Sequence, residues 1–463
     1  MKAIDNRGLA VVVLAAGKGK RMNSEVPKVL HRICGRPLLA YVLDQVAALD
    51  AGEVIVVVGH GAEQVEPEIG SRGRPVLQSE QLGTGHAVMT ALEALDRRYG
   101  EVLVMPGDSP LLEAETLAEL IEARRAGPSA ASMLTARLED PAGYGRVLRD
   151  EAGAVRGVVE ESDATVEERA IDEVNACTYC FDRAALEAAL GSLGRENAQG
   201  EYYLTDAVAG MVGKGLLVVP RVCASGEIIG VNDREQLSEA EALMRDRINR
   251  SWMEAGVSMA DPALTYIDFG VEVGSDTVIM PLVFLTGETR LGRGCRIGPM
   301  TSIKDSTLGE GCSVELSWLD GCHAADDVTI GPYSRLRPGC ELAAGSRVGS
   351  FVEMKNTTLG RGSKVPHLSY MGDARIGEET NVGAGSITCN YDGEAKHETV
   401  IGDRAFIGSD TMLVAPVQIG DDAATGAGSA ISRDVPAGGL GIERGEQKIV
   451  EDWRRKKRKK GRE

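Results

Sequence analysis

The sequence is poor in aromatic residues and contains no long apolar run. Phe, Trp and Tyr make up 4% of its 463 residues, so any core must be packed mainly by Val, Ile, Leu and Ala. No stretch approaches the roughly 18 uninterrupted apolar residues that span a membrane. The N-terminus lacks the basic start and cleavage site of a signal peptide, and we expect Leu9 to Ala16 to form a buried first strand. These features favour a cytoplasmic protein, and the length predicts two or three domains.

The cysteines do not have the pattern of a disulfide framework. There are nine, an odd number, and they are scattered through the chain. Reduced thiols in a cytosolic protein are the better interpretation. Cys177 and Cys180 form a C-x-x-C pair, but no second ligand pair accompanies them. We expect them to be two core positions of a strand.

Charge is distributed unevenly along the chain. The formal net charge is −18, yet the last ten residues carry eight Lys or Arg and one Glu, which leaves about −25 on the rest. Such a body repels nucleic acid. An RNA-binding scaffold is therefore the least favoured function, and it would require salt-dependent binding that is lost with the tail. For the basic tail, residues 451–463, we favour a disordered, solubilising end over a tether to RNA or an anionic surface.

Two regions of the chain follow different hydrophobic periods. Up to residue 232, short β-rich runs alternate with helical stretches, which is typical of an open parallel sheet with helices on both faces. Residues 233–254 predict one linking helix. From 255 to 450, aliphatic residues recur every six positions, as at Leu291, Ile297 and Ile303. This period predicts a β-helix of hexapeptide repeats with about 18 residues per coil, whereas ordinary hairpins would give spacings of about 8 to 12. Residues off the period, such as 388–399, predict loops, where function often lies.

The turn after the first strand is suited to phosphate. Residues 14–22 read LAAGKGKRM, and Pro27 and Lys28 follow. Glycines let backbone N–H groups approach phosphate oxygens, and Lys18, Arg21 and Lys28 add positive charge. Neither a dinucleotide fingerprint nor a Walker loop is present. Taken alone, the segment could equally be a plain strand-to-helix turn.

Asp108 follows the predicted strand Glu101 to Met105. Ligands of open α/β sheets bind at the carboxyl ends of the strands, and Mg²⁺ prefers a carboxylate together with phosphate oxygens. An Asp in this position is as often a turn former, so the residue alone leaves both interpretations open.

Together these motifs resemble the sugar-phosphate nucleotidyltransferases. LAAGKGKRM, LQSEQLGTGHA (77–87) and GYGRV (143–147) are similar in particular to the bacterial bifunctional UDP-N-acetylglucosamine pyrophosphorylases and glucosamine-1-phosphate N-acetyltransferases. The second half resembles hexapeptide acyltransferases in the runs SRLRPG, FVEMKN, HLSYMGDA, NVGAGSITCNYDG and IGSDTMLVAP. The resemblance covers nearly the whole chain and ends at the basic tail.

For the first half, the resemblance implies a uridylyltransferase (pyrophosphorylase) domain, residues 1–232, of Rossmann-like α/β fold. The residues implied to hold the uridine nucleotide are Leu14, Ala15, Ala16, Gly17, Lys28, Gln78, Gly83 and Thr84. Those implied to contact the sugar or its phosphate are Gly145, Glu160, Asn175 and Asn232. Asp108 and Asn232 are implied as Mg²⁺ ligands, with Arg21 and Lys28 offsetting charge on the phosphates. Pro106 stands where the family usually has an aromatic residue.

For the second half, the resemblance implies an acetyltransferase domain, residues 255–450, folded as a left-handed β-helix. His367 opens the family's H-L-[S/T]-Y segment, and an imidazole suits removal of a proton from an ammonium near neutral pH. Pro366 is an unusual residue before it. Arg337 and Lys355 are implied to bind the sugar phosphate. Tyr370, Asn381, Asn390 and Tyr391 would line the sugar and acetyl pockets, and Ala384, Ser409, Ala427 and Arg444 would contact coenzyme A. The other five histidines are assigned to structure or solvent.

The resemblance thus implies an Mg²⁺-dependent bifunctional enzyme. It would acetylate glucosamine-1-phosphate with acetyl-CoA, then transfer UMP from UTP to N-acetylglucosamine-1-phosphate. The products would be pyrophosphate and UDP-N-acetylglucosamine, a precursor for cell-wall and lipopolysaccharide synthesis. The family is homotrimeric, with acetyl-transfer sites between subunits. The alternative is a nucleotidyltransferase whose β-helix is only structural or regulatory. A degenerate β-helix should lack the base and the phosphate ligands together, and here His367, Arg337 and Lys355 are all present.

Overall fold

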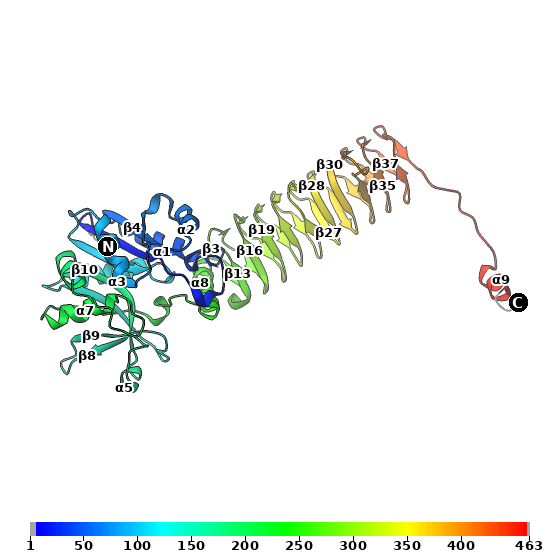
Figure 1. The fold of residues 1–463 in the computed structure, drawn as a ribbon. Coiled ribbons are helices and arrows are strands. Elements are labelled where there is room, and N and C mark those ends of the chain that lie inside the picture. The colour runs from blue at the N-terminus through cyan, green and yellow to red at the C-terminus, as the bar shows by residue number, and fades with distance from the viewer. Residues whose placement is uncertain (1–5, 461–463) are drawn as a thin grey trace. The chain divides into compact units, whose positions relative to one another are not determined.

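The computed structural model describes residues 6–460 (Figure 1). Contacts divide the chain into two compact units at Asp246, a position inside helix α8 (Arg234–Glu254). Within the described range, no helix is long and apolar enough to cross a membrane. Where the sequence favours a disordered end, helix α9 (Trp453–Lys460) forms. The last three residues of the basic tail lie outside the described residues.

The first unit is built on a mixed sheet with the strand order β11-β7-β10-β6-β1-β4-β5. The strands in chain order are β1 (Leu9–Ala15), β4 (Glu53–Val58), β5 (Arg74–Leu77), β6 (Glu101–Pro106), β7 (Ala131–Arg137), β10 (Glu173–Asp182) and β11 (Val218–Val222). A small antiparallel extension adds β8 (Arg146–Arg149) and β9 (Val155–Val159), and β2 (Arg32–Ile33) pairs separately with β3 (Arg36–Pro37). The sequence predicts an open parallel sheet, and most of the central strands are parallel, but β10 runs antiparallel to both of its neighbours.

Helices cover both faces of this sheet because its central strands are apolar on both sides. In β1, Ala10 and Val12 join one buried cluster, which includes side chains of α3, α6 and α7. Leu9, Val11 and Val13 join a second cluster, with side chains of α1, α2 and α4. The helices are α1 (Leu38–Ala47), α2 (Ala62–Ile69), α3 (Thr84–Ala94), α4 (Ala114–Arg125), α5 (Val166–Arg169), α6 (Arg183–Leu190) and α7 (Leu204–Gly213). Buried strands of this kind read as continuous apolar runs.

The prediction for the C-x-x-C pair is half wrong. Cys180 is buried in β10, as expected, but Cys177 is exposed. The pairing of β10 with β7 shifts between Asn175 and Tyr179, so the residues between them form a bulge. A bulge displaces side chains from the strict alternation of a strand, and this displacement takes Cys177 out of the core.

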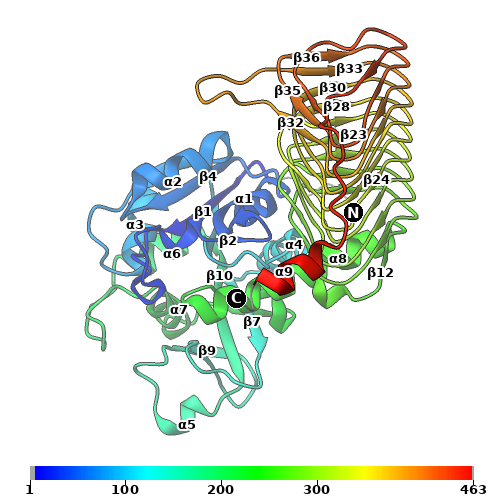
Figure 2. The same cartoon turned by 90° about the vertical axis from the view of Figure 1, so that its right-hand side faces the viewer.

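The second unit is a parallel β-helix whose strands stack in three columns (Figures 1 and 2). The first column contains β12 (Ser258–Met259), β15 (Val278–Ile279), β18 (Arg296–Ile297), β21 (Ser313–Val314), β24 (Thr329–Ile330), β27 (Arg347–Ser350), β29 (Lys364–His367), β31 (Asn381–Val382), β34 (Phe406–Ile407), β37 (Ala424–Thr425) and β39 (Leu440–Gly441). The second contains β13 (Thr265–Ile267), β16 (Val283–Thr286), β19 (Ser302–Lys304), β22 (Trp318–Asp320), β25 (Arg335–Leu336), β28 (Glu353–Leu359), β30 (Tyr370–Ile376), β32 (Ile387–Cys389), β35 (Met412–Val414) and β38 (Ala430–Ile431). The third contains β14 (Glu272–Val273), β17 (Arg290–Leu291), β20 (Thr307–Leu308), β23 (His323–Ala324), β26 (Glu341–Leu342), β33 (Thr399–Ile401) and β36 (Val417–Ile419), with the long strands β28 and β30 pairing into it.

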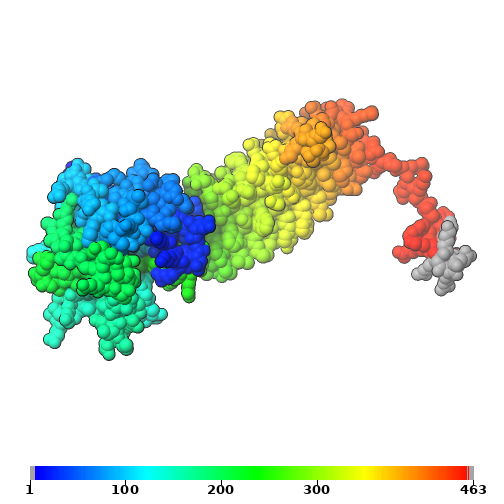
Figure 3. All heavy atoms as spheres, viewed as in Figure 1, coloured from blue at the N-terminus to red at the C-terminus, as the bar shows by residue number. Residues whose placement is uncertain are grey.

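The aliphatic residues of the six-residue period point into the interior that the three columns of strands enclose. Ile279, Ile297, Val314 and Ile330 pair in successive coils and belong to one continuous buried cluster. The space-filling view shows successive coils packed against one another along the column (Figure 3). The coils are not all of the predicted length: the step from Ile279 to Ile297 is 18 residues, as predicted, but the next two steps are 17 and 16 residues. The shorter coils interrupt the six-residue pattern in the sequence between Ile303 and Ile330.

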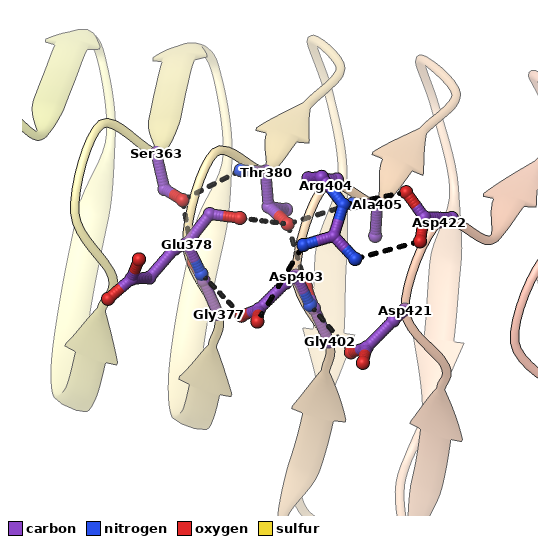
Figure 4. A network of polar contacts seen from close by, with 10 residues as sticks. All are labelled: Ser363, Gly377, Glu378, Thr380, Gly402, Asp403, Arg404, Ala405, Asp421 and Asp422. Carbon is purple, nitrogen blue, oxygen red and sulfur yellow. Dashed lines mark hydrogen bonds and ion pairs between the residues drawn. The ribbon is translucent and has the colours of Figure 1, made fainter.

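Polar side chains complete the backbone hydrogen bonds at the corners of the coils (Figure 4). The carboxylate of Asp403 accepts from the backbone N–H of Glu378 at 2.8 Å, and Asp421 does the same for Asp403 at 2.9 Å. Ser363 accepts from the N–H of Thr380 at 2.8 Å. Side chains therefore satisfy backbone N–H groups at exposed turns and also at the buried turn of Thr380, where an unpaired N–H would be costly.

The inward and outward positions of one strand give a direct test of this packing. Ile297 is fully buried, and Arg296 beside it is exposed. Ile297→Ala should lower the free energy of unfolding of the second unit by about 2–5 kcal/mol, because it leaves a cavity in the column. Arg296→Ala should change it by no more than about 0.5 kcal/mol. Urea denaturation followed by tryptophan fluorescence isolates this unit, since Trp252, Trp318 and Trp453 all lie in it. Equal losses in the two variants would contradict the inward assignment.

Candidate active sites

Three candidate residues from distant parts of the first unit meet at one point. The Lys28 ammonium forms a close ion pair with the Asp108 carboxylate and donates to Oδ1 of Asn232 at 3.0 Å. Asp108 follows β6, Lys28 begins the short helix η2 (Lys28–Leu30), and Asn232 precedes α8. The backbone N–H of Val231 donates to the Asp108 carbonyl at 3.0 Å, which holds the segments after β6 and before α8 together.

This arrangement fits a hard divalent cation. The Asp108 and Asn232 oxygens converge on one positive charge, and oxygen ligands of this kind suit Mg²⁺. Asn232 is oriented by its own amide N–H, which donates to the Gly230 carbonyl at 3.1 Å. Across residues 6–460, no three His, Cys, Asp or Glu side chains gather to hold a metal ion. A bound Mg²⁺ would therefore take its remaining ligands from phosphate and water.

The glycine-rich turn lies beside this point, at the carboxyl end of β1. Strand β1 pairs with β6 on one side and β4 on the other, so the strand order reverses there. Gly19 has φ +56°, and a Cβ at that position would lie 2.8 Å from Cβ of Lys28. The turn therefore requires glycine to let Lys28 approach. Arg21 lies in η1 (Lys20–Met22) with an exposed side chain.

The other nucleotide candidates border the same edge of the sheet. Gln78 is buried, its backbone N–H donates to the Val58 carbonyl at 2.8 Å, and its amide donates to the Gly83 carbonyl at 3.3 Å. The same amide lies 2.9 Å from Nδ1 of His86. Thr84 begins α3. Gln78 therefore joins the end of β5 to the start of α3.

The sugar candidates form a second group of neighbours. The N–H of Asn175 donates to the Gly145 carbonyl at 2.8 Å, and a Cβ on Gly145 would lie 3.3 Å from Oε2 of Glu160. Thr205 donates to Glu160 at 3.0 Å. Burial raises the pKa of Glu160, and the nearby charge of Asp206 adds to this effect, while the Thr205 hydrogen bond opposes it.

In the second unit, successive coils bring the phosphate and sugar candidates together. Arg337 donates to Glu353 at 3.1 Å, and Glu353 pairs in register with Tyr370. A Cβ on Gly372 would lie 2.4 Å from the Tyr370 hydroxyl and 2.8 Å from the Asn390 amide nitrogen. A compact polar patch therefore spans β28, β30 and the loop after β32.

The candidates for the base and for coenzyme A form a row along one corner. The His367 carbonyl accepts from the N–H of Gly385 at 3.3 Å, the Ala384 carbonyl from that of Asp410 at 2.7 Å, and the Ser409 carbonyl from that of Gly428 at 2.8 Å. At the next coil, Arg444 donates to the Ala427 carbonyl at 3.2 Å. Stacking of coils thus places His367, Ala384, Ser409 and Ala427 above one another, with an exposed His367 side chain at one end.

Lys396 is a further candidate residue that the sequence reasoning missed. It lies in the loop between β32 and β33, which projects from the column in Figure 2. The neighbouring Lys355 lowers the pKa of Lys396, because two like charges near each other disfavour protonation. Asp373 lies in the same patch and accepts from Asn356 at 2.8 Å and from Asn390 at 2.5 Å. The only signal in the sequence was that this loop interrupts the repeat.

Comparisons with known proteins identify the family. A family model described as the MobA-like NTP transferase domain matches residues 11–177. The chain is 51% identical over 449 residues to "Bifunctional protein GlmU" of Heliobacterium modesticaldum, covering 97% of this chain and 98% of that relative. Proteins of the same name from Pelobacter propionicus and Mycolicibacterium vanbaalenii are 47% and 48% identical, over 98% of this chain and 99% and 94% of theirs. The chain belongs to the GlmU family.

Membership of the GlmU family confirms three predictions from the sequence. The resemblance to the bifunctional enzymes is correct. The fold is a Rossmann-like nucleotidyltransferase domain followed by a left-handed parallel β-helix. The protein is a bifunctional uridylyltransferase and acetyltransferase that produces UDP-N-acetylglucosamine. The roles of individual residues in this GlmU-family chain remain predictions.

The desolvated carboxylate of Glu160 gives a pH-dependent prediction. The pKa of Glu160 is raised in the folded protein, so the folded protein holds the carboxyl proton more tightly than the unfolded chain does. Glu160 therefore destabilises the fold increasingly as the pH rises through its pKa in the folded protein. Glu160→Gln should therefore raise the melting temperature of the first unit at pH 7.5, and the gain should shrink as the pH is lowered.

Circular dichroism at 222 nm follows this transition, because helices α1 to α7 lie in the first unit. Glu167→Gln, on the exposed face of α5, is the matched control. A gain for Glu160→Gln that did not change with pH would show that the ionised carboxylate is not the cause.

Proposed function

We propose that the two activities are divided between the two units, with uridylyl transfer in the first and acetyl transfer in the second. One observation carries this division: each unit gathers its own cationic side chains at a polar site. In the first, Lys28 lies with Asp108 and Asn232. In the second, Lys355 of β28 lies near Lys396 of the loop after β32. Two like charges held close together favour an anion between them.

In the first unit, the phosphate of N-acetylglucosamine-1-phosphate would attack the α-phosphorus of UTP in line, and pyrophosphate would leave. This chemistry requires positioning and charge stabilisation, not a side-chain nucleophile. The nucleotide would lie along Leu14 to Gly17, Gln78, Gly83 and Thr84, with Arg21 and Lys28 offsetting phosphate charge. The sugar would contact Gly145, Glu160 and Asn175. Asp108 and Asn232 would hold Mg²⁺, which supplies electrostatic stabilisation of the phosphate oxygens when bound.

In the second unit, the phosphate of glucosamine-1-phosphate would bind to Arg337, Lys355 and Lys396. His367 would remove a proton from the substrate ammonium, and the free amine would attack the thioester carbonyl of acetyl-CoA. Ser409 would donate a hydrogen bond to the oxyanion that forms. The C–S bond then breaks, and the leaving coenzyme A thiolate takes up the proton that the new amide nitrogen loses. The residues proposed to line the sugar and acetyl pockets are Tyr370, Asn381, Asn390 and Tyr391, and those proposed to contact coenzyme A are Ala384, Ala427 and Arg444.

We also propose that the protein acts as a cytoplasmic homotrimer, with the β-helices in contact. Large apolar side chains stand exposed along one corner of the column: Met300, Tyr333, Phe351 and Leu368 are 55%, 55%, 57% and 65% exposed, and the rings of Tyr333 and Phe351 stack at 5.1 Å. Contiguous exposed apolar surface marks an interaction site. Because Leu368 adjoins His367 in the chain, a neighbouring subunit on this corner would lie beside the acetyl-transfer site. Nine free cysteines accord with a reducing compartment.

Substitution of one residue in each unit should separate the two activities. His367→Ala should lower acetyl transfer by about 10²–10⁴-fold, because it removes the proton acceptor, and should leave uridylyl transfer to supplied N-acetylglucosamine-1-phosphate unchanged. Asp108→Ala should have the opposite effect. Mass spectrometry of the products made from glucosamine-1-phosphate, acetyl-CoA, UTP and Mg²⁺ distinguishes the loss of acetyl transfer from the loss of uridylyl transfer. Full uridylyl transfer together with full acetyl transfer in the His367→Ala protein would mean that the β-helix uses another base.

Lys396 can be tested separately. Lys396→Ala should raise KM for glucosamine-1-phosphate by about 10- to 100-fold, the usual effect of losing one charge-assisted hydrogen bond. The KM for acetyl-CoA should change little. Lys304→Ala, which removes an exposed lysine from a distant coil, is the control. An unchanged KM for glucosamine-1-phosphate would remove Lys396 from the phosphate site.

A further inference from the structure

Cys177 occupies a strained position in the bulge of β10. Along β10 the pairing advances four residues, from Asn175 to Tyr179, while the partner positions on β7 advance only two, from Thr135 to Met133. The surplus residues leave the sheet. Cys177 has φ +54°, a left-handed conformation that non-glycine residues rarely adopt and that is often retained for function. Of the nine cysteines, it alone is exposed.

Cys177 fixes the side chain of Asn175. Its backbone N–H donates to Oδ1 of Asn175 at 3.2 Å, and Nδ2 of Asn175 lies 3.6 Å from its sulfur, as donor to acceptor. An amide side chain can turn over and exchange its donor and acceptor ends. Two contacts with the same residue, one at each end, select one of these orientations. The backbone of Asn175 is held in turn by Gly145.

The thiol of Cys177 lies among the charged residues of the uridylyl-transfer site. Although part of the residue is exposed, the atoms packed around the thiol desolvate it. This desolvation, and then the negative charges of Glu160 and Asp108, raise the pKa of Cys177 to about 12, while Lys28 opposes the shift. Each of these three residues is a candidate for binding a substrate or a metal ion. The thiol is therefore neutral at physiological pH, and a neutral thiol can contact a ligand or a neighbouring amide without adding charge.

A second side chain at the bulge has a buried hydroxyl that the protein does not satisfy. Tyr179 is 1% exposed, and its hydroxyl has no hydrogen-bond partner of normal geometry among residues 6–460. Burial, followed by the proximity of Cys177 and Glu160, raises its pKa, and Asn175 is close enough to oppose this. A buried hydroxyl without a partner is costly. A hydroxyl-rich ligand beside Asn175 would supply polar groups next to the Tyr179 hydroxyl.

We propose that Cys177 is a positioning residue of the sugar-phosphate pocket, which orients the Asn175 amide towards the sugar of N-acetylglucosamine-1-phosphate. This inference rests on the proposed function of the first unit, in which Asn175 contacts that sugar. Cys177 itself takes no part in the chemistry. Its effect is on the orientation of the amide, and therefore on the affinity for the sugar phosphate more than on that for UTP.

Kinetics of three full-length variants test the proposal. Cys177→Ala keeps Cβ but removes the sulfur acceptor, and it should raise KM for N-acetylglucosamine-1-phosphate by about 3- to 10-fold, the usual range for one hydrogen bond. The KM for UTP and the acetyl-transfer rate should stay unchanged. Cys177→Ser restores an acceptor and should recover much of the loss. Cys223→Ala removes a partly buried thiol of the same unit that contacts the Thr135 carbonyl, and it should have no effect on either KM.

Asn175→Ala separates failure of this inference from failure of the proposed function. If Asn175→Ala raises KM for the sugar phosphate while Cys177→Ala leaves it unchanged, the inference is overturned and the proposed pocket stands. If Asn175→Ala also leaves KM for the sugar phosphate unchanged, both the inference about Cys177 and the proposed sugar pocket fail. If Cys177→Ala and Cys177→Ser raise the KM values for both substrates equally and lower the 222 nm melting temperature, Cys177 is only a structural residue, which overturns the proposal too.

Discussion

Parallel strand pairing places residues that are far apart in the sequence side by side, and both candidate sites depend on it. In the first unit, β1 lies between β4 and β6 with all three carboxyl ends at one edge. This edge brings the glycine-rich turn to Asp108. In the second unit, the same pairing repeats coil after coil, so His367, Ala384, Ser409 and Ala427 form a row although each lies in a different coil. The aliphatic core of each unit holds this register.

Both sites contain groups that the folded protein does not fully compensate. Glu160 is desolvated, Tyr179 has a buried hydroxyl without a hydrogen bond of normal geometry within residues 6–460, and Lys355 lies close to Lys396. Each arrangement costs stability in the free protein, and each would be relieved by a bound sugar or phosphate. Arrangements of this kind are common at functional sites, where the surrounding core offsets their cost. The close-packed strands on either side provide that core here.

The sequence predicts the architecture well, because regular repeats follow directly from packing. The six-residue period identifies Ile297 and its equivalents as inward-facing, and the first strand and the linking helix lie within a residue or two of their predicted ends. Local departures from this regular architecture could not be predicted. Shortened coils break the period, the bulge in β10 exposes Cys177, and the reversal of β10 depends on long-range pairing. Motifs selected most of the candidate residues, but Lys396 lies in a loop whose proximity to Lys355 only the fold reveals.

The central claim is that one chain carries two sites that act independently. Mixing the His367→Ala and Asp108→Ala proteins with glucosamine-1-phosphate, acetyl-CoA, UTP and Mg²⁺ tests it most directly. Neither variant alone should make UDP-N-acetylglucosamine, whereas the mixture should make it after a lag, as free N-acetylglucosamine-1-phosphate passes from one protein to the other. A mixture that makes none, although the His367→Ala protein uridylates supplied N-acetylglucosamine-1-phosphate, would contradict the claim.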